Sequence, residues 1–461
     1  MTADIGVCGL GVMGRNLSLN ITDQGFRLVG YERSPDLRET ARAMGLDTHG
    51  EIGEFIRDLR RPRAILLMVT AGQPVDQIIA ALLPHLHAGD VIADGGNSVY
   101  CDTRRRLAML NENSIELIGL GVSGGKNGAR HGPSLMAGGN ETAYSRFSPI
   151  FTAIAARAND QMPCVEHLST AAPVGHFVKM MHNGIEYADM QMIAEIYDFC
   201  RKVLGLTATQ IADMFQTWNE GPLGSFLIQT TALVLSRKDD LTGAALVDMV
   251  LDSAGQKGTG RWAAITAAKL AVAAPSITES VTARIVSSLH SQRQRAATIF
   301  KSQRTKPQSI DQELFPDALL AGKICAYAQG FAVLSAASQH YDWGLNLANI
   351  AKVWRAGCII QADFLDEVKN AFRDAPVLDN LMLAPAFVES LRRTVPALRE
   401  VISASVHASV SVPALSASLA YFDAYTSRHS PANLIQAQRD SFGAHGYRRI
   451  DRDGKFHSDW R

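Results

Sequence analysis

The stretch Ile5-Gly-Val-Cys-Gly9-Leu-Gly11-Val-Met-Gly14 decides the fold of the N-terminal part of the chain. Its first residues predict a buried strand, its glycines follow the spacing G-x-G-x-x-G, and an amphipathic helix is expected from Arg15. Glycine permits a tight turn and lets the backbone approach a pyrophosphate, whose charge the helix N-terminus stabilises. We therefore predict a dinucleotide site rather than an ordinary glycine-rich turn. Its loop residues are Gly9, Gly11, Val12, Met13 and Gly14.

The sequence around this loop alternates short apolar runs with amphipathic segments up to about residue 170, as in a doubly wound parallel sheet. Strands are predicted at 5–8, 28–31, 64–69, 91–94 and 117–120, with 134–137 and 163–166 extending the sheet. Helical spacing between them is clear at 75–83 and 104–110. A second glycine cluster at 119–125 follows a strand, but Pro133 and further glycines are expected to interrupt any helix there. A third, at 255–260, lacks the Gly-Lys-Ser/Thr ending of a P-loop.

From about residue 173 the period changes to 3.6 residues, which predicts helices at 176–204, 208–215, 243–252, 277–301 and 322–340. The segment after Ser430 is short, polar and charged, so it cannot bury a core of its own. We predict an α/β Rossmann-type domain at 1–175, a large all-α substrate and dimerisation domain at 176–430, and a C-terminal tail at 431–461. The tail is expected to lie on another surface, that of a partner subunit.

Composition excludes several classes of protein. The 461 residues carry 45 basic and 45 acidic side chains, a balance that argues against a nucleic-acid or membrane-surface protein. Six scattered cysteines without a CxxC pair indicate free thiols in a reducing compartment, and no metal site is predicted. No basic leader opens the chain, and no uncharged apolar run reaches membrane-spanning length. We expect a cytoplasmic protein.

The end of the second predicted strand normally reads the adenosine ribose, and here it carries Glu32, Arg33 and Ser34. Glu32 is suited to accept hydrogen bonds from the ribose hydroxyls of NAD. Arg33 and Ser34 are suited to hold the 2′-phosphate of NADP. The pattern alone leaves both cofactors open.

A polar stripe marks the first long helix. Lys179, His182, Asn183, Glu186 and Tyr187 fall at i, i+3, i+4, i+7 and i+8, on one helical face. A solvated face is the alternative, but histidine, asparagine and tyrosine beside a single lysine and glutamate favour an enclosed site. Lys179 and Glu186 are then candidates for the base and acid that hydroxyl oxidation needs.

At this point the chain resembles the decarboxylating 6-phosphogluconate dehydrogenase family. The resemblance covers essentially the whole sequence and rests on long motifs. These are the loop at 9–14, DGGNS at 94–98 with DTRR at 102–105, GVSGG at 121–125, GAR at 128–130, GPSLM at 132–136, the segment 176–189, Trp218-Asn219, 254–260, WRAGCII at 354–360 and LIQAQRDSFGAH at 434–445.

The resemblance implies a Rossmann-type domain, a helical domain, and a homodimer whose tails thread into the opposite subunits. It implies oxidation of the C3 hydroxyl of 6-phosphogluconate by NADP or NAD, loss of CO2 and protonation of the enediol to ribulose 5-phosphate. Lys179 would be the base and Glu186 the acid, with His182 and Asn183 beside them. The carboxylate and hydroxyl end would be lined by Asn97, Ser123, Gly124 and Gly125. The phosphate would be held by Tyr187, Lys257, Arg284 and, from the other subunit, Arg439 and His445.

The same resemblance adds Val69, Thr70, Ala71 and Asn97 to the cofactor site, and it exposes three departures. Glu32 stands where the family usually has asparagine, Thr70 where lysine is usual, and Lys126-Asn127 where an acidic pair is usual. The first two make the cofactor site less positive. A carboxylate near a 2′-phosphate would disfavour NADP by about 1–3 kcal/mol unless Arg33 screens the two, so we predict NAD preference or dual use. Lys126 raises the alternative of a related phosphorylated sugar acid as substrate.

Two other functions remain in view. A non-decarboxylating β-hydroxyacid dehydrogenase shares the glycine loop and the Lys-x-x-x-Asn pattern, but it would lack Glu186-Tyr187 and the tail motif. A paralogue that binds the cofactor without turnover is disfavoured because Lys179, Glu186 and Arg439 are all present.

Overall fold

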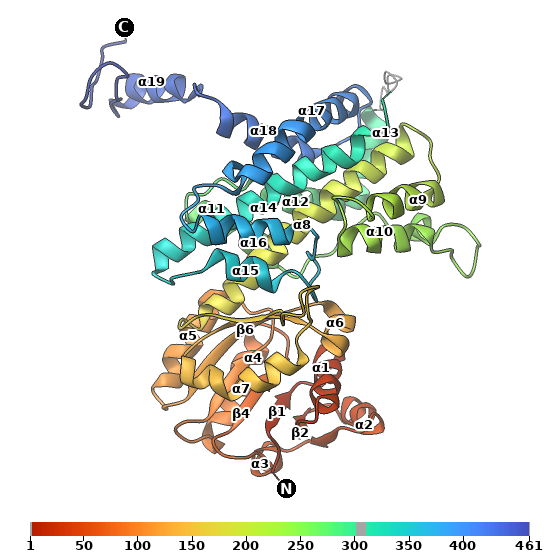
Figure 1. Ribbon diagram of the computed structural model, residues 1–461, viewed down its shortest axis with the longest axis vertical. Coiled ribbons are helices and arrows are strands. Elements are labelled where there is room, and N and C mark those ends of the chain that lie inside the picture. Colours follow the sequence, from red (N-terminus) through yellow and green to blue (C-terminus); the bar gives the residue numbers. More distant parts are fainter. Residues whose placement is uncertain (1, 301–309, 461) are drawn as a thin grey trace.

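The computed structural model describes residues 2–300 and 310–460 of the chain. It has a sheet with helices on both faces at the N-terminal end, a larger helical body above it, and a C-terminal helix, α19, that projects from the helical body (Figure 1). Residues 1, 301–309 and 461 belong to the predicted domains and, at Lys301, to a predicted helix, but they lie outside the described residues.

The sheet has eight strands in the order β3-β2-β1-β4-β5-β6-β7-β8. All adjacent pairs are parallel except β6 and β7, which are antiparallel. The strands are β1 Ile5–Cys8, β2 Leu28–Tyr31, β3 Asp47–His49, β4 Ala64–Leu67, β5 Val91–Asp94, β6 Glu116–Ser123, β7 Ser134–Gly138 and β8 Val165–Ser169. The order reverses between β1 and β4, which is the switch point where ligands bind in such sheets.

Helices connect the strands and cover the two faces of the sheet. They are α1 Val12–Asp23, α2 Pro35–Ala43, α3 Ile52–Arg57, α4 Gln73–Leu82, the 3-10 turn η1 Leu83–His85, α5 Tyr100–Asn111, α6 Gly125–His131 and α7 Glu141–Ile154. Two predictions were wrong here. The seven-residue α6 forms in spite of its glycines, and β3, a short polar edge strand, was not predicted.

The helical body is built around α8 and α14. Its elements are α8 Pro173–Lys202, α9 Ala208–Trp218, α10 Phe226–Ser236, η2 Leu246–Met249, α11 Thr259–Lys269, α12 Pro275–Ser288, α13 His290–Phe300, α14 Leu314–Tyr341, α15 Leu347–Val353, α16 Leu365–Asp374, η3 Leu381–Leu383, α17 Pro385–His407, α18 Pro413–Thr426 and α19 Ala432–Gly443. Among the described residues, α14 alone is long and apolar enough to cross a membrane, but 89% of that window is buried against other helices.

Two predicted helices differ from the structure. The segment 243–252 forms only the short turn η2, because Gly243 has φ +72° and Asp239 binds Thr242 through its side chain, which closes a turn instead. The segment 277–301 divides into α12 and α13 at Leu289. There the guanidinium of Arg293 donates hydrogen bonds to the carbonyl oxygen of Ser287 and to the carboxylate of Asp252, which stabilises the break.

Glycines bring α8 unusually close to the sheet. A methyl group at Gly175 would lie 2.0 Å from the carbonyl oxygen of Gly119 on β6, and one at Gly121 would lie 2.6 Å from Cβ of Lys179. Any larger residue at these positions would lift the helix away from the strand. The close approach places Lys179 beside Ser123, the last residue of β6.

Candidate active site

A cavity of about 340 Å³ lies outside the carboxyl ends of β1, β2 and β4. Gly9 at its edge has φ +95°, and a methyl group at Gly14 would lie 1.9 Å from the carbonyl oxygen of Gly9, so the turn requires glycine at both positions. A methyl group at Gly11 would meet nothing within 4 Å, which leaves this backbone open to a pyrophosphate. The loop and the helix N-terminus therefore fit the predicted dinucleotide.

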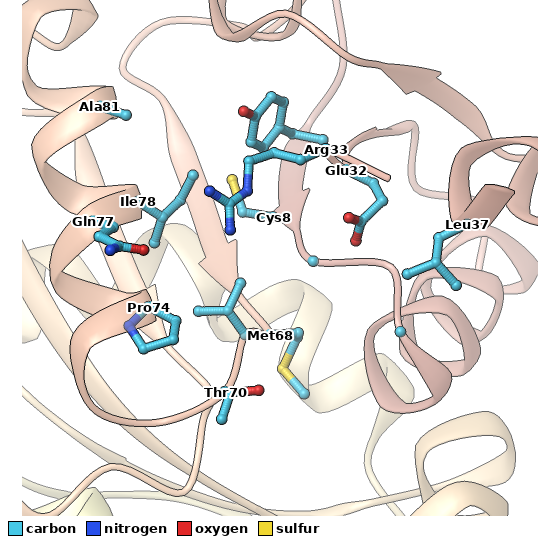
Figure 2. A pocket seen from close by; sticks show the side chains of 14 residues that line it. Cys8, Glu32, Arg33, Leu37, Met68, Thr70, Pro74, Gln77, Ile78 and Ala81 are labelled. Carbon is cyan, nitrogen blue, oxygen red and sulfur yellow. The ribbon is translucent and has the colours of Figure 1, made fainter. Parts of the chain in front are cut away.

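Glu32 and Arg33 occupy opposite sides of this cavity. The backbone N–H of Leu10 donates to Glu32 Oε2 at 2.9 Å, and that of Ser34 donates to Oε1 at 3.0 Å. Figure 2 shows the carboxylate turned toward Leu37, while the guanidinium of Arg33 extends toward Ile78 on α4. The carboxylate is thus fixed by the glycine loop and by Ser34, and within the described residues no ion pair joins it to Arg33.

The other predicted cofactor residues are placed as follows. Val69 and Thr70 line the cavity with Gly9, Gly11, Glu32 and Arg33. Val12, Met13 and Gly14 form the first turn of α1, Ser34 caps α2 through its hydroxyl, Ala71 precedes α4, and Asn97 is exposed on the turn after β5. None of these six lines the cavity itself.

One wall of the cavity was missed from the sequence. Pro74, Gln77, Ile78 and Ala81 line it from α4, together with residues of β1, of β2 and of the loop after β4. They fall at i, i+3, i+4 and i+7 and so share one face of the helix that follows the Val69–Thr70 loop. This spacing in the sequence could have identified them.

The polar stripe on α8 meets the end of β6. Lys179 Nζ donates to Ser123 Oγ at 2.9 Å, and Ser123 Oγ lies 3.1 Å from His182 Nε2. His182 Nδ1 lies 3.3 Å from Asn183 Oδ1 and 3.6 Å from Glu186 Oε2. Lys179 Nζ also lies 3.3 Å from His182 Nδ1, so the amine contacts both the serine hydroxyl and the imidazole. Five predicted residues are brought together.

Burial shifts the pKa values of these groups in the directions that proton transfer needs. It lowers the pKa of Lys179 from its ordinary value, an effect that Glu186 and then Cys358 oppose. It raises the pKa of Glu186, against the opposing charges of Lys179 and Arg284. It lowers the pKa of His182 well below its usual range, so this imidazole is neutral. Burial thus favours the uncharged form of both Lys179 and Glu186, and the attraction between their charges opposes both shifts.

A cationic side chain from α12 packs on Tyr187, the last residue of the polar stripe on α8. The guanidinium carbon of Arg284, on α12, stands 3.5 Å from the ring centroid of Tyr187. Gly260 lets α11 approach the same ring, since a methyl group there would lie 2.4 Å from it. Lys257 is exposed in the loop just before α11. Three of the predicted phosphate ligands thus lie on segments that meet around Tyr187.

Arg439 and His445, the other two predicted phosphate ligands, do not lie near Tyr187 in this chain. They line a separate cavity of about 990 Å³ within the tail, where most of the charged residues are basic. Asp440 organises the tail, accepting hydrogen bonds from Gly446 N, Ser458 N, the Trp460 indole and His457. In Figure 1 α19 points away from the helical body of its own chain. The predicted phosphate site is therefore incomplete within one chain.

Three further residues contact the predicted set. Thr259 Oγ1, at the start of α11, accepts a hydrogen bond from Asn183 Nδ2 at 3.1 Å. Cys358 is buried near Lys179 and Glu186, and its thiol lies 3.0 Å from the carbonyl oxygen of Trp354. Gly124, at φ +114°, packs against Gly357, since a methyl group there would lie 2.6 Å from the Gly357 oxygen. Thr259 and Cys358 lie inside the motifs at 254–260 and 354–360, so these motifs could have identified them from the sequence.

Comparisons with known proteins agree with this geometry along the whole chain. A model of the NAD binding domain of 6-phosphogluconate dehydrogenase matches residues 4–168. A model of the 6-phosphogluconate dehydrogenase C-terminal domain matches residues 175–460. The chain belongs to the 6-phosphogluconate dehydrogenase family. Since the match extends to residue 460, it includes the tail that a shorter β-hydroxyacid dehydrogenase would lack.

Two relatives from Bacillus subtilis (strain 168) differ in their cofactor. The chain is 45% identical to its "6-phosphogluconate dehydrogenase, NAD(+)-dependent, decarboxylating", with 100% of both chains covered. It is 47% identical to the NADP(+)-dependent enzyme of the same bacterium, covering 99% of this chain and 98% of that one. Overall identity therefore does not decide the cofactor of this chain, and the residues at the cavity must.

A solved structure confirms the fold. The chain is 39% identical to Plasmodium falciparum 6-phosphogluconate dehydrogenase, described in its apo form and in complexes with NADP+ and 6-phosphogluconate, with a TM-score of 0.94 and 99% and 100% of the two chains covered. The predicted resemblance, the Rossmann-type domain followed by a helical body, and the class of NAD(P)-dependent decarboxylating dehydrogenase are confirmed. The domain limits at 175 and 430 and the roles of single residues stay predictions.

Proposed function

We propose that this chain oxidatively decarboxylates 6-phosphogluconate to ribulose 5-phosphate and CO2 and passes the hydride to NAD or NADP. The observation that carries the proposal is the buried set of Lys179, Ser123 and His182 with Glu186 one turn away, in which the pKa of the amine is lowered and that of the carboxyl is raised. Pairs of groups whose pKa values shift in opposite directions are typical of acid–base sites.

The residues divide the reaction between them. The neutral amine of Lys179 removes the proton of the C3 hydroxyl. A nicotinamide cofactor held at the Gly9–Gly14 loop would supply the acceptor for the hydride from C3. The resulting ammonium donates a hydrogen bond to the C3 ketone oxygen and stabilises the negative charge that develops there as the C1 carboxylate leaves as CO2. Glu186 then donates its proton to the former C2 of the sugar acid, which becomes C1 of ribulose 5-phosphate, and the ketone forms at the former C3, which becomes C2 of that product.

We further propose that the phosphate is bound between two subunits. Arg284 on Tyr187 and Lys257 provide positive charge from one chain, and Arg439 and His445 are presented on a tail that points away from that chain. Arginine binds phosphate through paired, charge-assisted hydrogen bonds, so a homodimer with exchanged tails completes the site. The exposed side chains of Leu434, Ile435 and Phe442 on α19 give the tail an apolar face for that contact. The expected compartment is the cytoplasm.

From the residues at the cofactor cavity we propose NAD preference or dual use of NAD and NADP. The carboxylate of Glu32 accepts two backbone N–H groups at the end of β2, where a 2′-phosphate would have to lie, and Arg33 extends to the far side. A dianion placed beside a fixed carboxylate is repelled, whereas ribose hydroxyls can donate to it. Thr70, which also lines the cavity, adds no positive charge.

A cofactor comparison tests this preference. We expect kcat/KM to be higher for NAD than for NADP in the native protein. Glu32→Asn should shift the ratio toward NADP by about 10- to 100-fold, the equivalent of about 1–3 kcal/mol. Glu39→Gln, an exposed change on α2, is the matched control that should leave the ratio unaltered. A native protein that strongly prefers NADP would contradict the assignment.

The activity itself is tested with a panel of sugar acids. With 6-phosphogluconate we expect reduced nicotinamide and CO2 to form in equal amounts. Gluconate, which lacks the phosphate, should be a poor substrate. Reduction of the cofactor without CO2 would indicate a non-decarboxylating dehydrogenase. A higher kcat/KM for another phosphorylated sugar acid would show that Lys126, exposed at the start of α6, marks a change of substrate.

A further inference from the structure

Arg106 is a completely buried cation that none of the roles above uses. It lies on α5, and its guanidinium meets two separate loops. On one side Nη2 donates to the Gly72 carbonyl oxygen at 2.9 Å and Nε donates to Asp76 Oδ1 at 2.8 Å. On the other side Nη1 donates to Ser98 Oγ at 3.1 Å and to Asp94 Oδ2 at 3.3 Å. One side chain therefore bridges the loop after β4 and the turn after β5.

Both segments belong to the site. The loop after β4 carries Val69 and Thr70, which line the cofactor cavity. The turn after β5 carries Asn97, and Asp94 fixes its shape by accepting from Gly96 N at 3.0 Å and Ser98 Oγ at 2.7 Å. The two segments also touch, since a methyl group at Gly96 would lie 3.0 Å from the carbonyl oxygen of Val69. A shift of one segment must move the other.

His176 connects the same turn to the catalytic helix. Its Nε2 lies 2.9 Å from the carbonyl oxygen of Asp94, and its Nδ1 lies 2.7 Å from Thr103 Oγ1 on α5. A carbonyl oxygen only accepts, so Nε2 carries the proton and Nδ1 accepts from Thr103. Burial lowers the pKa of His176, which keeps the ring neutral in this arrangement. Lys179 follows His176 by one turn on α8.

We propose that Arg106 and His176 are positioning residues that couple the cofactor loop at 69–72 to the catalytic helix α8 through the turn at 94–98. The coupling rests on the proposed function, because it means that bound cofactor changes the affinity for 6-phosphogluconate and bound 6-phosphogluconate changes the affinity for the cofactor. Binding the cofactor fixes the loop after β4, Arg106 transmits that constraint to the Asn97 turn, and His176 fixes the turn relative to Lys179. A lysine in place of Arg106 cannot serve both loops, since it lacks the planar fork of five donors.

The test is a pair of binding titrations on each full-length variant. The Kd of NADH is measured by its fluorescence, with and without saturating 6-phosphogluconate, and the ratio of the two values is the coupling factor. In the native protein we expect a ratio that departs from 1 by about 5-fold or more. Arg106→Lys and His176→Gln should bring it to within about 2-fold of 1 and should raise the KM for 6-phosphogluconate more than they lower kcat.

Arg105→Met is the matched control. Arg105 also binds Asp76, at 2.9 Å, but it lies on the surface and its other ion pair is with Asp102 rather than Asp94. Its removal should leave the ratio unchanged. Loss of stability alone lowers the amount of active protein and alters neither the ratio nor KM, so thermal unfolding of each variant separates the two effects.

Thr103→Val provides a test if Arg106→Lys or His176→Gln fails to fold, because it removes only the hydroxyl that donates to His176. It should reduce the coupling in the same direction by a smaller factor. A native ratio of 1, or an unchanged ratio in Arg106→Lys, His176→Gln and Thr103→Val, would overturn the proposal while normal native turnover preserved the proposed function. A native protein that does not bind 6-phosphogluconate would overturn both.

Discussion

The proposed catalytic end, at Lys179, and the proposed phosphate end, at Tyr187, lie about two turns apart on α8, yet they are assembled differently. Lys179, Ser123 and His182 are buried and joined by hydrogen bonds within one chain. At the phosphate end, Arg284 stacks on Tyr187, but Arg439 lies on the distant α19 (Figure 1). Proton transfer requires fixed distances of about 3 Å, which a helix packed tightly on a sheet provides. Binding a dianion requires charge, and a separate segment can bring it.

The largest expected effect comes from the catalytic end. Lys179→Met should lower kcat/KM by about 10²–10⁴-fold, because it removes the buried amine that contacts Ser123 and His182. The Kd of NADH should stay the same, since Lys179 does not line the cofactor cavity. Steady-state turnover and a fluorescence titration measure the two quantities.

Lys202→Met is the matched control on the same helix. Its ammonium is half exposed and pairs with Asp198 at 2.7 Å, far along α8 from the site. Turnover should be unaffected. If Lys179→Met retained native turnover, the base would have to be another group, and the assignment of proton transfer to this end of the site would be wrong.

A smaller effect is expected at the phosphate end. Arg284→Met and Arg439→Met should each raise the KM for 6-phosphogluconate by about 10- to 100-fold, the value of a charge-assisted hydrogen bond of about 1.5–3 kcal/mol, with a lesser change in kcat. Both variants should also narrow the preference for 6-phosphogluconate over gluconate. A large loss of kcat with unchanged KM would place these arginines in the chemistry instead of in binding.

The pH dependence of kcat/KM sharpens the account of the catalytic end. Activity should rise with pH as Lys179 loses its proton, and burial moves this ascending limb to lower pH because it lowers the pKa. Activity should fall as Glu186 loses its proton, and burial moves this descending limb to higher pH because it raises the pKa. A bell-shaped profile is therefore expected, and a flat profile around neutral pH would contradict these roles.

The smallest effect concerns Asp189, whose charge contributes to the raised pKa of Glu186. Asp189→Asn removes that charge and leaves the buried Lys323, its partner at 2.9 Å, uncompensated. Both changes favour the ionised form of Glu186, so the descending limb should move to lower pH by about one unit or less. Asp198→Asn, near the exposed end of α8, should leave the profile in place. A shift to higher pH would contradict the electrostatic account.

The sequence predicted what depends on local pattern. The glycine loop was found because its spacing is set by the turn itself, and the stripe at 179–187 because helical period places those residues on one face. The 3-10 turn η2 and the break between α12 and α13 were missed because side chains of Asp239 and Arg293 form hydrogen bonds that periodicity does not report. The antiparallel β7 and the short polar β3 depend on pairing with strands elsewhere.

The same division applies to the site. Lys179, Glu186 and Tyr187 could be named from the helix pattern. The other predicted residues, Ser123, Lys257, Arg284, Arg439 and His445, required the family resemblance, since nothing in their local sequence links them to α8. The contact between Ser123 and Lys179 exists because glycines 119, 121 and 175 let two distant segments approach. The orientation of Arg33 away from Glu32 also lay beyond the sequence, because it depends on how α4 borders the cavity.

Complementation between two subunits impaired at different ends of the site tests the contrast between the two ends most directly. Lys179→Met and Arg439→Met chains, coexpressed with different affinity tags, are purified as the mixed dimer. If the tail completes the site of the opposite subunit, one site combines an intact Lys179 with an intact Arg439, and the mixed dimer should recover about half of the native kcat at native KM. If each tail served its own chain, every site would carry one of the two changes, and a mixed dimer no more active than its parents would contradict the account.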